Sequence, residues 1–143
     1  MYFIRIVMGK NMNTRTAISD LFTREEITEL TAKSDLHGTW AVFSTWAVIG
    51  GTFAAVAGFW EYLPNWGKLL LCIAALVILA GRQLALAIIM HDASHQSLFK
   101  TKWFNDIATD WLCARPIWND LKKYRAHHLR HHSKTSTVDD PDL

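Results

Sequence analysis

The histidines are the residues of this chain whose spacing most directly suggests chemistry, because six of the seven fall in two clusters. In the first cluster, His91–His95 (HDASH), the two histidines are four residues apart and would share one face of a helix. In the second cluster, His128, His131 and His132 are spaced i, i+3 and i+4, which again defines one helical face. Neutral imidazoles are good ligands for iron, zinc and copper. Each cluster is therefore a candidate metal-binding face.

Either cluster alone also has an ordinary interpretation. A histidine pair at this spacing arises by chance, and the flanking Arg125 and Arg130 would make the second cluster a solvated basic helix end. Together, however, five imidazoles exceed what one tetrahedral zinc with an open position requires. The two clusters therefore predict a site for two metal ions. His127 lies about 100° around a helix from His128, so we expect it to support the ligands or to face solvent.

Two long apolar segments must position these histidines. Residues 38–60 contain no charged side chain, and they extend over about 34 Å as a helix, enough to cross the apolar core of a bilayer. Residues 61–65 indicate a short turn, and a second apolar segment begins near Trp66. Because an arginine at mid-bilayer is costly, we expect Arg82 near the interface and residues 84–90 beyond the lipid, buried in protein. The sequence thus predicts a transmembrane helical hairpin.

The distribution of Lys and Arg predicts which side of the membrane the histidines face. The turn between the two apolar segments has only Lys68 nearby, whereas basic residues are frequent before residue 38 and after residue 95. The positive-inside rule therefore places both termini and both histidine clusters in the cytosol. The net charge of +2 is too small to suggest nucleic acid, and no basic stripe with interleaved aromatic residues is present.

Shorter helices are expected on either side of the hairpin. Thr23 and Glu26 have the spacing of a capping box, which predicts an interfacial helix over about 23–34, ended by residues 35–38. Apolar residues at alternating steps of one and three predict an amphipathic helix over 103–112, on the membrane surface or against the cytosolic cap.

The last helix carries the second histidine cluster. Pro116 would stop the amphipathic helix, and another helix would begin near Asn119 or Asp120. We therefore expect an all-α integral membrane fold in three parts. These are a cytosolic N-terminal segment with an interfacial helix (1–37), the transmembrane hairpin with its second helix extending into the cytosol (38–95), and a cytosolic cap segment (96–143).

Over residues 38–143 the chain resembles the membrane fatty acid desaturase superfamily. His91-x-x-x-His95 and His128-x-x-His131-His132 are similar to the first two histidine boxes of that superfamily. The surrounding residues 91–99 and 124–132, followed by Asp140-Pro141-Asp142, resemble its bacterial members. The family uses a third box after a second hairpin, and this chain stops at Leu143. We therefore expect it to correspond to the N-terminal part of a family member and to be inactive alone.

The resemblance implies a non-haem di-iron oxidoreductase of lipid metabolism. Two iron ions would use O2 and two electrons to oxidise an unactivated C–H bond in a lipid acyl chain, with a ferredoxin or a cytochrome b5-like protein as electron donor. The implied metal ligands are His91, His95, His128, His131 and His132. Residues that would support those ligands by accepting or sharing a ring N–H are Asp92, His127, Asp140 and Asp142. For the three aspartates, an ordinary helix cap or surface charge is an equally good interpretation.

Three other functions remain open at this point. Carotenoid ketolases and hydroxylases of the same superfamily have similar boxes. A membrane zinc protease would have a motif like His91-Asp92-x-x-His95, with glutamate in place of the aspartate, but it leaves the second cluster unexplained. The third possibility is that the 143-residue chain by itself is a non-catalytic membrane fragment.

Overall fold

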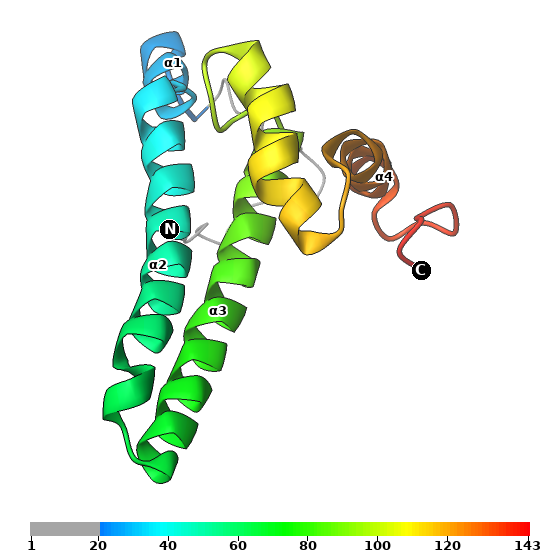
Figure 1. Cartoon of the computed structure of the whole chain (residues 1–143). Helices are drawn as coiled ribbons and strands as arrows, with labels where there is room; N and C mark the ends of the chain where they lie inside the picture. Colours follow the sequence, from blue (N-terminus) through cyan, green and yellow to red (C-terminus); the bar gives the residue numbers. More distant parts are fainter. Residues whose placement is uncertain (1–20) are drawn as a thin grey trace. The chain divides into compact units, whose positions relative to one another are not determined.

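The computed structural model describes residues 21–143, and all regular elements within that range are helices (Figure 1). It divides into two units at residue 32. In the first unit, α1 (Arg24–Leu30) has the predicted capping box, in which the Glu26 amide donates to Thr23 Oγ1 at 3.2 Å and the Thr23 amide donates to Glu26 Oε2 at 2.8 Å. The predictions for residues 1–20, which make up most of the N-terminal segment, concern residues that the structure does not describe.

The predicted end of the first helix is wrong. Helix α1 ends at Leu30, and residues 35–38 do not terminate it but open the next helix, α2 (Asp35–Phe59). Ser34 is the N-cap of α2, where its hydroxyl accepts a 3.4 Å bond from the His37 amide. The Asp35 carboxylate in the first turn also complements the positive end of the helix dipole. These local interactions extend α2 three residues upstream of the expected boundary.

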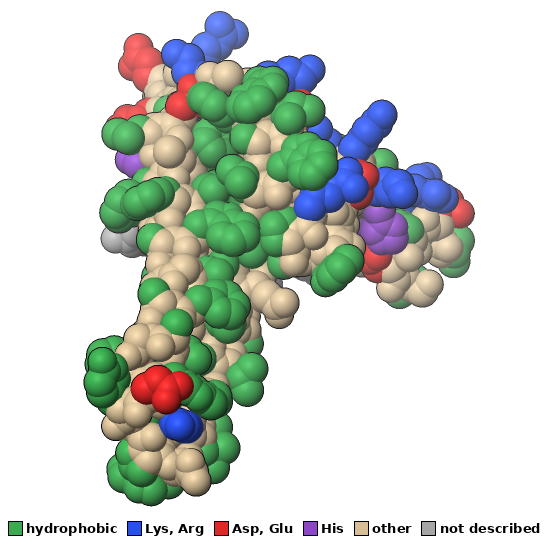
Figure 2. Space-filling view, viewed as in Figure 1, with side chains coloured by type: hydrophobic (Ala, Val, Ile, Leu, Met, Phe, Trp, Pro, Cys, Tyr) green, Lys and Arg blue, Asp and Glu red, His purple; other side chains and the backbone are tan. Residues whose placement is uncertain are grey.

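In the second unit, α2 and α3 (Asn65–Ser94) lie side by side and antiparallel (Figure 1). The short helix η2 (Trp60–Tyr62) and the N-cap Pro64 make the turn between them, as expected from the residues there. Both helices are long and apolar enough to cross a membrane by length and composition, and few residues of their most apolar stretches are buried. Figure 2 shows hydrophobic side chains along them, with Lys and Arg side chains over the C-terminal cap.

The expectation that residues 84–90 are buried in protein holds for one face only. Leu86, Ile89 and Met90 are buried, whereas Leu84 and Ile88 are 63% and 53% exposed. Leu84 and Ile88 are not part of the hydrophobic core that this end of α3 forms with residues of α2 and the cap. The buried face belongs to a core at the histidine end of the hairpin, which is formed by Val42, Leu86, Ile89, Met90, Ala93, Phe99, Cys113, Ala114 and Leu121.

The loop that follows the first histidine cluster is tied to the start of α2. Phe99 is buried against Gly38, where an added Cβ would lie 2.6 Å from the phenyl ring. Two residues later, the backbone amide and the hydroxyl of Thr101 donate to the Asp35 carboxylate at 2.8 and 2.7 Å. These contacts hold the end of α3 next to the beginning of α2.

The amphipathic helix is present, but it is not an α-helix. Residues Phe104–Ala108 (η3) and Asp110–Ala114 (η4) form π-helical turns, followed by the 3₁₀ turn Arg115–Ile117 (η5). The segment packs along α3, and the Trp46 indole N–H donates to the Leu112 carbonyl at 2.9 Å. It therefore runs beside the hairpin, level with Trp46 of α2, rather than across its end.

The last helix, α4 (Leu121–Lys134), begins where the sequence predicts. Asp120 is its N-cap and accepts a 2.9 Å bond from the Lys123 amide. Before it, Trp118 adopts a left-handed conformation (φ 61°) that reverses the chain direction after Pro116. Leu121 is buried in the core near the end of α3. The second histidine cluster is thereby brought beside the first.

Candidate metal centre

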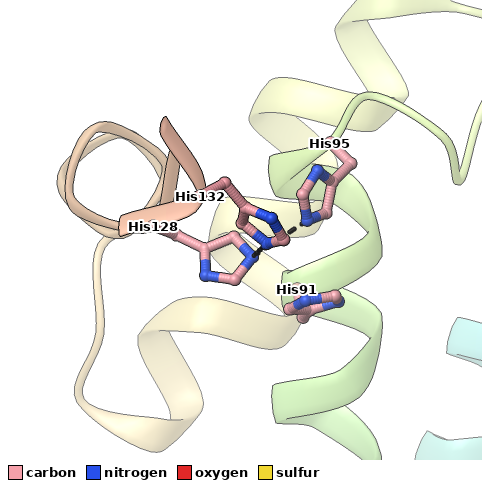
Figure 3. Close-up of side chains that lie close together, drawn as sticks. All are labelled: His91, His95, His128 and His132. Atoms are coloured by element: carbon pink, nitrogen blue, oxygen red, sulfur yellow. Dashed lines mark hydrogen bonds between the residues drawn. The ribbon is translucent and has the colours of Figure 1, made fainter. Parts of the chain in front are cut away.

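Four imidazoles converge where the end of α3 meets α4 (Figure 3). We call His91 and His95 the α3 pair, and His128 and His132 the α4 pair. Each of the four histidines offers one ring nitrogen, and these four nitrogen atoms all lie within 4.8 Å of one another. His128 is central, because its Nε2 atom lies 2.9 Å from His95 Nε2 and 3.0 Å from His132 Nε2. The structure thus brings the two sequence clusters together.

The two short nitrogen separations suit a metal centre. Each is short enough for an N–H···N hydrogen bond between a protonated and an unprotonated ring nitrogen. The same nitrogens are close enough together to be neighbouring ligands of one metal ion, which would replace these hydrogen bonds. The residues present therefore fit a transition-metal ion that accepts several imidazoles.

The protonation of these histidines also suits metal binding. Burial lowers the pKa of His95, and the nearby His91 and His132 lower it further. Burial likewise lowers the pKa of His128, with further contributions from His91 and His132. A lowered pKa keeps the imidazole neutral at physiological pH, which is the form that binds a metal.

His131, the fifth predicted ligand, does not join the other four. Its Nδ1 atom lies 2.7 Å from Asp140 Oδ1 and 3.1 Å from Asp142 Oδ2. The hydrogen bond to Asp140 raises the pKa of His131. The ring remains beside the α4 pair, with its centroid 5.8 Å from that of His132. When His131 is neutral, Asp140 favours the tautomer with its proton on Nδ1 and leaves Nε2 unprotonated.

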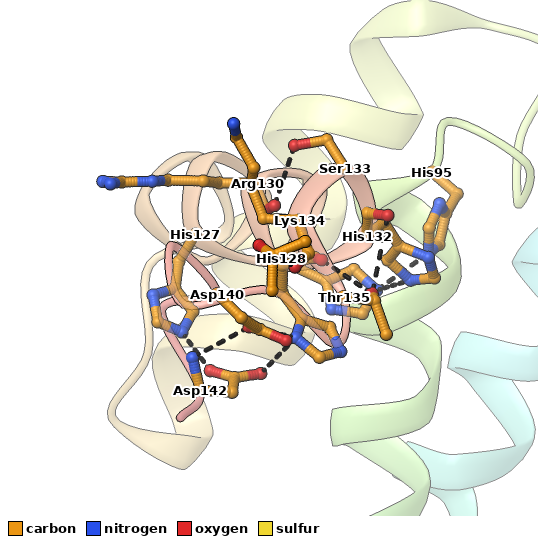
Figure 4. Close-up of polar contacts among 12 residues, drawn as sticks. His95, His127, His128, Arg130, His132, Ser133, Lys134, Thr135, Asp140 and Asp142 are labelled. Carbon is orange, nitrogen blue, oxygen red and sulfur yellow. Dashed lines mark hydrogen bonds and ion pairs between the residues drawn. The ribbon is translucent and has the colours of Figure 1, made fainter.

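The four residues predicted to support the ligands all contact histidine side chains or share a partner with one. Asp92 Oδ1 lies 3.2 Å from His91 Nδ1. His127 Nε2 lies 2.7 Å from Asp142 Oδ1, so His127 is directed to that carboxylate (Figure 4). Asp140 is 7% exposed and also accepts a 3.0 Å bond from the Asp142 amide. The C-terminal residues 140–142 therefore form a carboxylate support beside α4.

Sequence reasoning missed a polar network that joins α3 to α4. The Arg125 side chain donates to the Ala93 and Ser94 carbonyls at 2.9 and 3.0 Å, and to Asp106 Oδ1 at 2.6 Å. Asn105 is buried and donates to the same Ala93 carbonyl at 2.9 Å. The signal in the sequence was the position of Arg125, which is three residues before His128 and therefore on the same helical face.

Comparison with known proteins gives the chain a family. The sequence model named Fatty acid desaturase matches residues 64–143, more than half of the chain, and this range includes both histidine clusters. The sn-1 acyl-lipid omega-3 desaturase (ferredoxin) of Nostoc sp. (strain 36) is 36% identical over 58 residues, which are 41% of this chain and 16% of that protein. This chain thus matches a small part of that relative's length, and no solved structure matches it. The chain belongs to the fatty acid desaturase family.

Proposed function

We propose that this chain provides part of the di-iron centre of a membrane-bound enzyme that oxidises C–H bonds of a lipid acyl chain with O2. The observation that carries the proposal is the convergence of the α3 pair and the α4 pair. His95 and His128, which lie within hydrogen-bond distance of each other, are 33 residues apart in the sequence. Family membership supports a desaturase-type oxidoreductase, and a relative is named as acting on acyl lipids.

The residues proposed to hold iron are His91, His95, His128, His131 and His132. Bound iron would supply the activation of O2 that removes hydrogen from an unactivated methylene. Burial would keep the imidazoles of His95 and His128 neutral, and the two helices would direct the α3 pair and the α4 pair at the metal. Asp92 and Asp140 each lie within hydrogen-bond distance of an Nδ1 atom, a position from which a carboxylate orients a histidine and sets its tautomer.

We further propose that α2 and α3 cross the membrane, with residues 61–66 outside and both termini and all histidine clusters in the cytosol. The length and apolar composition of the two helices support membrane crossing, and the Lys and Arg distribution supports the orientation. The division into residues 1–37, 38–95 and 96–143 follows this topology. A ferredoxin or a cytochrome b5-like protein would supply electrons from the cytosolic side, in line with the ferredoxin named for the relative.

Two alternatives differ in how well they fit. A carotenoid ketolase or hydroxylase of the same superfamily would have the same kind of metal centre, so the identity of the product decides between it and an acyl-lipid desaturase. A zinc protease built on His91-Asp92-x-x-His95 would need only the α3 pair and would leave the α4 pair without a role. In the structure, however, His128 of the α4 pair lies within hydrogen-bond distance of His95. The arrangement therefore disfavours the protease.

The test combines metal and product analysis. The protein, produced with and without the residues that follow position 143 in its genomic reading frame, is loaded anaerobically with Fe²⁺ and its iron is quantified. The longer form should hold two irons and, with reductase and ferredoxin, desaturate acyl lipids. The proposal fails if neither form retains iron. It also fails if the His91→Ala and His128→Ala variants retain as much iron as the wild type.

A further inference from the structure

Arg125 joins the two helices that carry the histidine pairs. Its guanidinium lies between the end of α3 and residue Asp106 of η3, with the arginine side chain 20% and the aspartate side chain 23% exposed. Nε donates to the Ser94 carbonyl at 3.0 Å, and one Nη donates to the Ala93 carbonyl at 2.9 Å and to Asp106 at 2.6 Å. One side chain of α4 therefore binds the backbone of α3 directly.

The end of α3 needs such a partner. The last carbonyl groups of an α-helix have no intrahelical donor and must be satisfied by other groups. Ala93 and Ser94 are both buried and lie between His91 and His95, so water is not available to their carbonyls as it is at an exposed helix end. Positive charge at this end also complements the helix dipole. Arg125 therefore donates to the Ser94 carbonyl, and it shares the Ala93 carbonyl with the Asn105 side chain and the Gln96 backbone amide, next to the α3 pair.

The same side chain is in register with the α4 pair. Arg125 precedes His128 by three residues and His132 by seven, so all three lie on one face of α4. On the other helix, the Ser94 carbonyl that it binds is adjacent in sequence to His95. Two hydrogen bonds from the Arg125 side chain thus connect the helical face of the α4 pair to the carbonyls of the two residues before His95.

We propose that Arg125 is a positioning residue that holds the α3 pair and the α4 pair at the separation at which they share a metal. This inference rests on the proposed function of the histidines and adds what fixes their relative position. Arginine suits the role because its planar fork presents several N–H donors in fixed directions, whereas a lysine ammonium on a flexible stem cannot reproduce that pattern.

The test uses Co²⁺ as a probe of the 1–143 chain in detergent, because bound Co²⁺ absorbs visible light according to its ligands. Arg125→Ala should weaken Co²⁺ binding by about 10–100-fold, as loss of groups that orient metal ligands does. Arg125→Lys should restore only part of the affinity. The matched control is Arg130→Ala, an exposed arginine about 140° around α4 from Arg125, which should leave the affinity unchanged.

A second readout separates positioning from general stability. At saturating Co²⁺, the spectrum of Arg125→Ala should match that of the His128→Ala/His132→Ala variant, because the two pairs no longer share the ion. Loss of stability alone would lower the bound fraction without changing the spectrum. If Arg125→Ala loses helical circular dichroism, Arg125→Lys decides the question, and wild-type affinity in that variant would overturn the proposal.

The outcomes also distinguish this proposal from the one on which it rests. Absence of Co²⁺ binding by the wild type, or unchanged binding after His91→Ala, would refute the metal centre and the role of Arg125 together. A different outcome would overturn the role of Arg125 alone. In that outcome the wild type binds Co²⁺ and His128→Ala abolishes binding, but the Co²⁺ affinities of Arg125→Ala and Arg125→Lys equal that of Arg130→Ala.

Discussion

The Nε2 atoms of His95 and His128 lie 2.9 Å apart, although the two residues are separated by 33 positions in the chain. This contact joins the end of an apolar hairpin to a polar helix that follows it. It gives the two histidine clusters one shared centre.

His128→Ala and His127→Ala should have different effects, even though the residues are neighbours. His128 is the central member of the four-imidazole group, and its loss should abolish iron retention and activity in the full-length protein. His127 is directed to Asp142, so its loss should leave substantial activity. Iron quantitation and a product assay on both variants check this. Equal losses would mean that the ligand assignment in the second cluster is in error.

Asp140→Asn should lower the pKa of His131. The hydrogen bond to Asp140 raises this pKa, so the interaction stabilises the folded protein fully below the unfolded-state pKa of about 6.5 and is lost as the pH rises through the higher folded-state pKa. An NMR titration of the imidazole signals measures the shift. Asp139→Asn is the matched control, since Asp139 is exposed and pairs with Lys134 at 3.7 Å. An unchanged His131 pKa in Asp140→Asn would contradict the assigned contact.

Gly38→Ala should destabilise the protein by about 1–3 kcal/mol, because the new methyl group would overlap the Phe99 ring at a buried contact. Gly50→Ala in the same helix meets no atom within 4 Å and should be neutral or slightly stabilising. Thermal unfolding in detergent, followed by circular dichroism, compares the two variants. A smaller loss for Gly38→Ala than for Gly50→Ala would show that Phe99 does not pack on Gly38.

The proposed topology predicts where an introduced cysteine reacts. In a background without Cys72 and Cys113, Asn65→Cys at the exposed turn should react with an impermeant thiol reagent only from outside the cell. Ser136→Cys, exposed after α4, should react only from the cytosolic side. Labelling of intact cells and inverted vesicles measures both. Cytosolic labelling of Asn65→Cys would refute the hairpin orientation.

The isolated 1–143 chain should hold less than two irons and form no oxidised acyl or carotenoid product. Five imidazoles are too few to hold two irons and leave room for O2, and metal binding is coupled to folding of the ligand-bearing segments. Iron quantitation with a product assay in the presence of reductase and electron donor checks this. A stoichiometric di-iron site with turnover would show that association between copies supplies further ligands.

Much of the helical structure could be predicted from local sequence. The capping box at Thr23, the turn at Pro64 and the N-cap at Asp120 lie where the residues indicate, because caps and turns depend on neighbouring residues alone. The histidine clusters could also be found from spacing. The start of α2 differs from the sequence prediction, because Ser34 and Asp35 suit a helix start and residues 35–38 therefore open α2 instead of ending α1.

Only the tertiary structure decided which histidines meet. Spacings of i, i+3 and i+4 put His128, His131 and His132 on one face, but that face is broad, and the rotation of α4 about its axis selects the residues that reach α3. That rotation depends on contacts between distant residues, such as Leu121 in the core and Arg125 on the α3 carbonyls. The sequence by itself therefore determined the helices and the candidate ligands, whereas non-local packing grouped four histidines together and placed His131 with Asp140.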